Sequence, residues 1–171
     1  MSVHLWIKLV HVLSATILFG TGIGTAFFMF KAYLSKNDQA MRITTNTVVM
    51  ADWIFTTPAV VIQLATGLWL TRELNIPFDS SWFIVVVALY ALVGICWIPV
   101  VWIQIRIRNL IADGESRDSY QKLMRIWVAL GVPAFSSVVL IFYLMVSRLG
   151  AYGWRIAPDL LDTPQPDIEK T

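Results

Sequence analysis

The residues best suited to chemistry stand close to the start of the chain. His4, Lys8 and His11 follow one another at intervals of four and three residues, so on a helix all three share one face. A neutral imidazole can ligate haem iron, copper or zinc, and it can relay a proton near neutral pH. His11 lies deepest in the apolar stretch, and it is therefore the candidate metal ligand.

Haem b is one cofactor that His11 could hold. His4 and His11 are about 10 Å apart along a helix, too far to be the two axial ligands of one haem. A second ligand would have to come from another helix, and cationic side chains at the same depth would meet the haem propionates. The candidate cofactor-binding residues are His11, Lys8, Gln63, Tyr143 and Arg148.

Two opposite charges stand where the second and fourth apolar segments begin. Asp52 and Arg125 each precede one of these segments, and in an alternating bundle they lie at matching depths. An unpaired charge at that depth is costly. We therefore expect a structural ion pair between Asp52 and Arg125.

Glycines give the first segment a second specialised face. Gly20 and Gly24 form a small-xxx-small pair, which lets another helix backbone approach closely. This face lies nearly opposite His11 on an ideal helix. It predicts packing against another helix, in the same bundle or in a second subunit.

The elements that must position these residues are membrane-spanning helices. The chain has 171 residues, of which 57% are hydrophobic and only 14% are charged, a composition too apolar for an ordinary soluble domain. Four windows lack Asp, Glu, Lys and Arg, and each is close to the ~20 residues that cross a bilayer. They are residues 9–30, 53–71, 80–105 and 126–147. The predicted fold is all-α, an integral membrane four-helix bundle over residues 1–148, with a polar, partly disordered tail at 149–171.

The charges between the windows predict the orientation. Residues 32–46 form a polar connection after the first span, and Asp113 with Gly114 breaks the connection after the third. These two connections and their flanks hold eight of the 13 basic residues, which by the positive-inside rule places both termini outside. We expect a multi-pass protein of the bacterial inner membrane.

Other classes of site and partner have little support in the sequence. The net charge of +2 is small and spread over loops, so no nucleic-acid partner is predicted. The expected partners are the lipid bilayer and either a second copy or another membrane protein. The single Cys96 cannot form an intramolecular disulfide.

Three stretches of the sequence resemble a known family. They are IKLVHVLSATILFGTGIGTAFFM at residues 7–29, DWIFTTP at 52–58 with GLWL at 67–70, and WVALGVPAF at 127–135. This pattern resembles the bacterial predicted integral membrane proteins of domain-of-unknown-function family 2269. That resemblance implies the four-span fold and no particular activity.

A more distant resemblance implies haem or copper. An early histidine, a Pro and Gly in the second span and a Pro in the last are similar to HemJ-type protoporphyrinogen oxidases and CopD-like copper-resistance proteins. In the HemJ-type family an early histidine and a later lysine are implicated in haem binding. His11 matches the first, whereas Arg148 stands nearest the second, and a guanidinium does not ordinarily ligate iron.

Three function classes follow from these observations. The favoured one is a non-catalytic membrane partner or accessory subunit that uses the Gly20 and Gly24 face. The alternatives are a haem-binding redox protein that uses His11, and a copper or small-solute transporter that uses the polar interior.

Overall fold

The chain forms long helices joined by short turns. The computed structural model describes residues 3–153, and the side chains of residues 3–147. The elements are α1 (Val3–Leu34), α2 (Asp38–Ala51), the π-helical turn η1 (Asp52–Thr56), α3 (Thr57–Glu73), α4 (Ser81–Ala112) and α5 (Arg117–Gly153), with no strand among residues 3–153. The helix α5 includes residues 149–153, the first five residues of the predicted tail. The rest of that tail lies outside the described residues.

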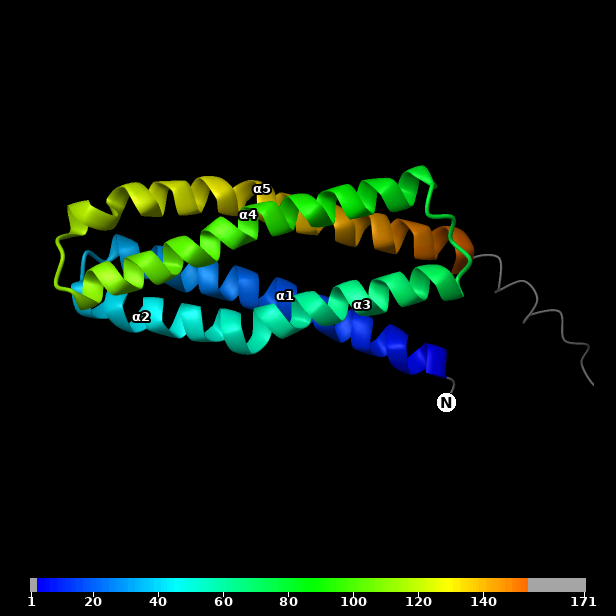
Figure 1. Ribbon diagram of the computed structural model, residues 1–171, viewed down its shortest axis with the longest axis horizontal. Coiled ribbons are helices and arrows are strands. Elements are labelled where there is room, and N and C mark those ends of the chain that lie inside the picture. Colours follow the sequence, from blue (N-terminus) through cyan, green and yellow to red (C-terminus); the bar gives the residue numbers. More distant parts are fainter. Residues whose placement is uncertain (1–2, 154–171) are drawn as a thin grey trace, which may run out of the picture.

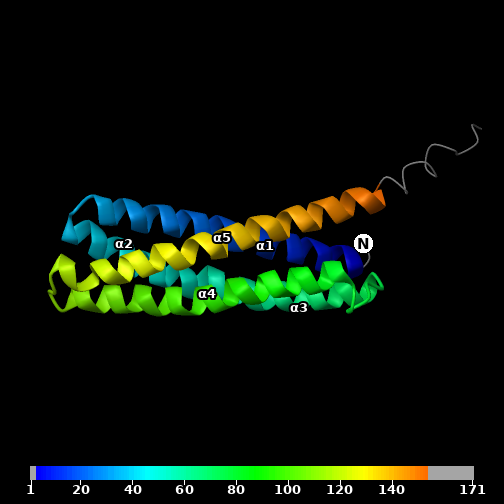
Figure 2. The same cartoon turned by 90° about the horizontal axis from the view of Figure 1, so that it is seen from above.

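Four helical segments are long and apolar enough to cross a membrane, as the sequence predicts: α1, the continuous run Asp38–Glu73, α4 and the described part of α5. Figure 1 shows that the α1–α2 and α4–α5 turns lie at one end of the bundle. The N-terminus, the α3–α4 connection and the end of α5 lie at the other. Figure 2 shows the same antiparallel arrangement from above, with α5 crossing over α1. The structure is therefore the predicted all-α bundle.

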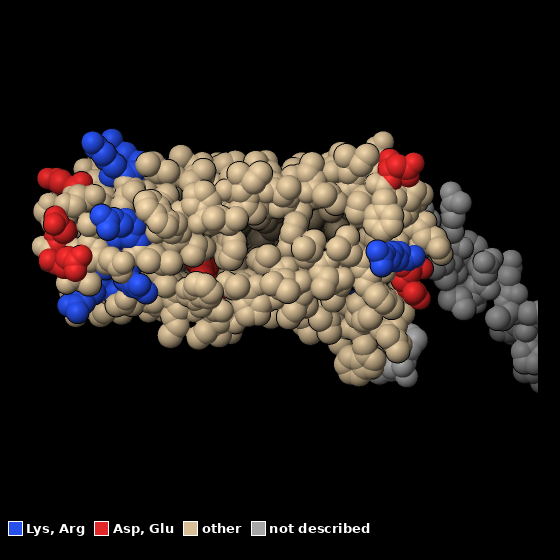
Figure 3. All heavy atoms as spheres, in the orientation of Figure 1, with Lys and Arg blue, Asp and Glu red and all other residues tan. Residues whose placement is uncertain are grey.

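The surface of the bundle matches a bilayer. Large apolar side chains on every spanning helix are exposed, which is the arrangement that a hydrocarbon solvent favours. Figure 3 shows basic and acidic side chains gathered at the two ends, with a broad band between them that is nearly free of charge. The protein is an integral membrane protein, and the charged side chains seen on this face lie mainly at the two ends of the bundle.

The first connection is far shorter than the sequence predicts. Residues 32–46 were expected to form a polar connection, but α1 reaches Leu34 and α2 begins at Asp38. Asn37 caps α2 by accepting a hydrogen bond from the Ala40 N–H at 3.0 Å, which satisfies one free donor of the first turn. The polar residues of this stretch belong to an amphipathic helix whose other face is buried, so polarity alone misplaced the boundary.

A π-helical turn marks the join between α2 and α3. The Thr57 N–H donates to the Asp52 carbonyl, five residues back, and the Thr57 hydroxyl donates to the same oxygen at 2.9 Å. Pro58 has no N–H and its ring crowds the preceding turn, so one extra residue is accommodated there. This irregular turn joins α2 to α3, and Asp52 at its start is buried.

The densest packing lies at the end of the bundle with the two turns. Its buried apolar side chains come from α1, α2, α4 and α5, so this cluster ties all four spans together. They are Met29, Ala32, Met41, Val48, Ile103, Ile107, Tyr120, Met124 and Trp127. His11 lies in the other half, where contacts between α1 and α3 position it.

Candidate functional site: a polar cluster between two helices

His11 is held by two side chains of α3. Its Nδ1 lies 2.8 Å from Thr66 Oγ1, and its Nε2 lies 3.0 Å from Gln63 Nε2. Gln63 and Thr66 are three residues apart and therefore share one face of α3. Both ring nitrogens of His11 are thus engaged inside the bundle.

The hydrogen-bond directions define one arrangement of protons. The Thr66 hydroxyl donates its hydrogen to the Ile62 carbonyl at 2.6 Å, so Thr66 Oγ1 accepts from the Nδ1–H of His11. The Gln63 amide then donates to the unprotonated Nε2. This assigns the neutral Nδ1–H tautomer to His11, on the basis of the surrounding hydrogen bonds.

Ser14 extends the cluster by one turn along α1. It is buried, and its hydroxyl donates to the Gln63 carbonyl oxygen and to the His11 backbone carbonyl at 2.9 Å. The acceptor end of Gln63 is thereby used as well as its donor end. These hydrogen bonds join Ser14, His11, Gln63 and Thr66, which we call the α1–α3 polar cluster.

Gly67 gives the imidazole room. A Cβ placed on Gly67 would lie 3.3 Å from Cε1 of His11 and 3.9 Å from its Nδ1. Such contacts are tighter than ordinary van der Waals separations. The missing side chain at residue 67 therefore permits the close approach of α1 and α3 at the histidine.

A haem iron or a metal ion at His11 would have to compete with these hydrogen bonds, and the role of His11 as a ligand stays a prediction. A ligand bond needs an unprotonated ring nitrogen, and Nε2, which is unprotonated here, already accepts from Gln63. Iron or copper would have to displace that amide and leave it without a partner in the membrane interior. Among the described residues there is also no group of three or more His, Cys, Asp or Glu side chains placed to hold an ion.

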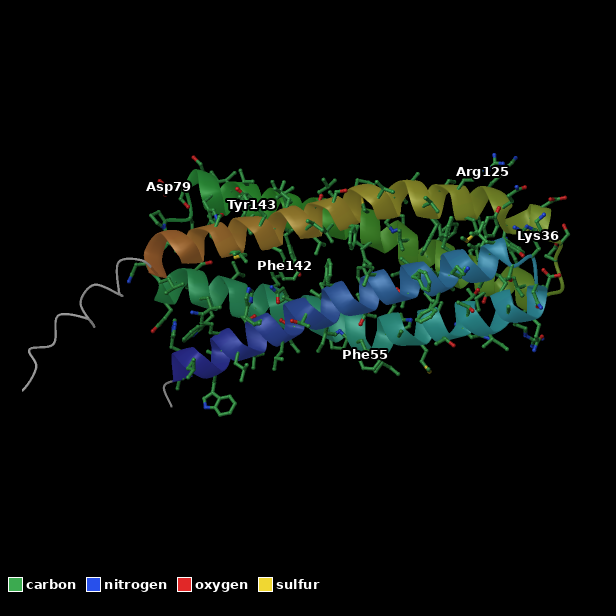
Figure 4. All side chains as sticks on the ribbon, turned by 180° about the vertical axis from the view of Figure 1, so that it is seen from behind. Lys36, Phe55, Asp79, Arg125, Phe142 and Tyr143 are labelled. Carbon is green, nitrogen blue, oxygen red and sulfur yellow. The ribbon has the colours of Figure 1, made fainter. Side chains whose placement is uncertain are left out.

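The other candidate cofactor-binding residues do not converge on His11. Lys8 is exposed, and Tyr143 is 67% exposed. Figure 4 shows Tyr143 on the outer side of α5 and Phe142 on the side toward α1. Only Gln63 joins His11, and the side chain of Arg148 lies outside the described residues.

The expected ion pair between Asp52 and Arg125 is not formed. Asp52 is 5% exposed, whereas Arg125 is exposed and points away from the bundle in Figure 4. The prediction matched their depths along the membrane but had no means of fixing the rotation of α5 about its axis. A long guanidinium side chain near a helix end reaches the aqueous surface instead.

Asp52 interacts with polar groups in place of an arginine. The Thr56 hydroxyl donates to Asp52 Oδ1 at 2.9 Å, and Gln104 of α4 is the second side chain that interacts with the carboxyl group. Sequence reasoning did not select Gln104, because it is a single amide in an otherwise apolar span. It also missed Ser14, although a serine one turn from an interior histidine is a usable signal.

Gly20 and Gly24 lie on an open face of α1. A Cβ added at either position would have no neighbour within 4 Å. The contact between α1 and α5 lies elsewhere on the helix, where the Phe19 ring is 5.5 Å from the rings of Phe135 and Phe142. The described chain therefore places no helix against the two glycines.

Comparison with known proteins places the chain in a family. No curated protein and no solved structure matches it. The expected similarity to HemJ-type and CopD-like proteins stays a prediction. Residues 5–149 match the family model described as predicted integral membrane protein, DUF2269, and the chain belongs to this family.

Proposed function

We propose that this protein is a non-catalytic membrane partner, an accessory subunit that works through contacts between transmembrane helices. The observation that carries the proposal is the open glycine face of α1, where Gly20 and Gly24 have no neighbour in their own chain. Close backbone approach at small residues is a main source of helix association in lipid.

The composition of this face supports a protein helix as its occupant. Leu13, Ile17 and Phe27 are exposed, and on an ideal helix they lie on the same side as the two glycines. Large apolar side chains beside small residues form a shallow groove that a facing helix can fill. The absence of charge between residues 9 and 30 favours an apolar partner within the bilayer.

The occupant we propose is α1 of a second copy. A Gly-xxx-Gly face is self-complementary, because each helix offers the other the same gap and the same flanking side chains. A two-fold axis along the membrane normal therefore brings the two faces together. The chemistry of His11 is not needed for this role, since both ring nitrogens are used within the chain.

Substitution of the glycines tests the proposal. Gly24→Leu and Gly20→Leu should convert a dimer of the full chain into a monomer in mild detergent, as measured by sedimentation equilibrium. Gly94→Leu on α4 is the matched control, because a Cβ there also meets nothing within 4 Å, and it should leave the mass unchanged.

Two results would overturn the proposed contact. One is a monomeric wild-type chain in both detergent and lipid nanodiscs. The other is a dimer that persists in both α1 variants. A stable complex with a different membrane protein that is lost only in the α1 variants would reassign the occupant while retaining the accessory role.

A further inference from the structure

Asp52 is buried within a membrane-spanning segment without a counter-charge. It is 5% exposed, and no described basic side chain within residues 3–147 forms an ion pair with it. On the helices that pack around it, Lys31 of α1 and Arg106 of α4 are exposed. His11 of α1 is bonded to α3. Among the side chains of residues 3–147, none would neutralise an ionised carboxylate in this position.

One oxygen of the Asp52 carboxyl group has no hydrogen-bond donor. Asp52 Oδ1 accepts from the Thr56 hydroxyl at 2.9 Å, but Oδ2 is buried and has no donor. Gln104 is 2% exposed, and its Oε1 is likewise buried without a donor. Trp127, whose Nε1 has no acceptor, donates to neither oxygen.

The unpartnered oxygen of Asp52 is the atom at which a proton would bind. An ionised carboxylate only accepts hydrogen bonds, and no described group donates to the buried Oδ2. A buried polar atom left without a partner costs about 1–3 kcal/mol, and an ionised group costs considerably more. One proton on Oδ2 removes the charge.

We propose that Asp52 is a proton-binding site, held as a neutral carboxylic acid with its proton on Oδ2. One proton adds to the carboxylate, and no other bond forms or breaks. The Thr56 hydroxyl donates to the carbonyl oxygen of the acid, and the buried Gln104 side chain interacts with the same carboxyl group. This inference goes beyond the accessory role and does not depend on it.

The local backbone supports a specialised site. Asp52 begins the π-helical turn η1, and π-helical turns occur frequently at functional sites. Pro58, one turn later, leaves a carbonyl of this segment without its helical N–H donor. Ionisable groups that face the interior of membrane bundles are typical of proton relays.

Infrared spectroscopy of the full chain in detergent or nanodiscs at pH 7 tests the proposal. A protonated carboxylic acid has a carbonyl band distinct from the carboxylate and amide bands, and we expect Asp52→Asn to remove one such band. Asp79→Asn, at an exposed position outside the spans, is the matched control and should leave the band in place.

A second variant tests the hydrogen bond between Thr56 and Asp52 while the carboxyl group stays in place. Thr56→Val keeps the side-chain shape and removes the donor to the carbonyl oxygen, so the band should remain and move to higher frequency. An infrared spectrum in which Asp52→Asn removes no carboxylic acid band would overturn the proposal. Loss of the band when sodium chloride replaces choline chloride at constant pH would also overturn it, because a metal cation would then occupy the site.

Discussion

His11 is the interior residue whose chemistry is most restricted by its neighbours. Thr66 accepts a hydrogen bond from the Nδ1–H of His11, and the Gln63 amide donates one to Nε2. The imidazole therefore links α1 to α3 in one tautomer. Interhelical hydrogen bonds of this kind stabilise membrane bundles by about 1 kcal/mol each. At this scale the histidine links two helices, whereas the buried carboxyl group of Asp52 lies in another part of the bundle, at the start of η1.

A side chain at residue 67 should destabilise the bundle, because the imidazole of His11 lies close to Gly67. Gly67→Ala should destabilise the bundle by about 1–3 kcal/mol, because the new methyl group meets a ring that Thr66 and Gln63 hold in place. Gly94→Ala on α4, where a Cβ has open space, should be neutral or stabilising by up to ~1 kcal/mol, since alanine favours helix. Thermal unfolding in detergent, followed by circular dichroism, measures both.

Equal unfolding temperatures for the two alanine variants would contradict this account of the site. A further result against it would be a stabilised Gly67→Ala protein, because that would show that the ring moves freely.

The second spanning segment consists of three parts, α2, η1 and α3, and each part makes different contacts. The helix α2 packs a buried face into the core, η1 turns Asp52 inward, and α3 carries Gln63 and Thr66 to His11. Because the π-helical turn adds one residue, the faces of α2 and α3 are rotated relative to a regular helix. A regular helix through this segment would present a different set of residues to α1 and α4.

The packed face of α2 predicts a large difference between two methionines of the same helix. Met41 is 1% exposed, whereas Met50 is 57% exposed. Met41→Ala should therefore cost about 2–5 kcal/mol, as expected for a truncated core residue, and Met50→Ala should cost less than ~1 kcal/mol. Unfolding of the two variants in the same detergent gives the comparison, and similar losses would show that α2 is not anchored as described.

The whole molecule has two chemically different ends. Most basic side chains lie at the end with the α1–α2 and α4–α5 turns, and both described chain ends lie at the other (Figures 1 and 3). The positive-inside rule relates such an asymmetry to the cytoplasmic side. It supports our proposal of an inner-membrane protein of bacteria with both termini outside.

Cysteine labelling tests this orientation, because Lys36 and Asp79 lie at opposite ends of the bundle (Figure 4). In a Cys96→Ala background, Asp79→Cys should react with a membrane-impermeant maleimide in intact spheroplasts. Lys36→Cys should react only after the membrane is opened. The reverse pattern would place both termini inside the cell.

The spanning segments follow from the sequence because hydrocarbon imposes a simple rule on every residue. A window of the right length without formal charge is stable there only as a helix whose backbone groups bond within the segment. All four windows accordingly lie within helical segments of the structure, apart from Ser80, which caps α4. Gly114, with φ +76°, ends α4 where the Asp113 and Gly114 breaker predicts, because that backbone conformation suits glycine.

Rotation about each helix axis was decided only by the tertiary structure. Helical spacing puts Gln63 and Thr66 on one face of α3. It could not select His11 as their partner, nor bring Gln104 to Asp52 and send Arg125 to the surface. Those outcomes depend on how side chains from several helices fill one interior together, whereas bilayer thickness and charge act on each segment alone. The sequence by itself therefore determined the helices and their membrane setting, and packing determined which polar groups meet.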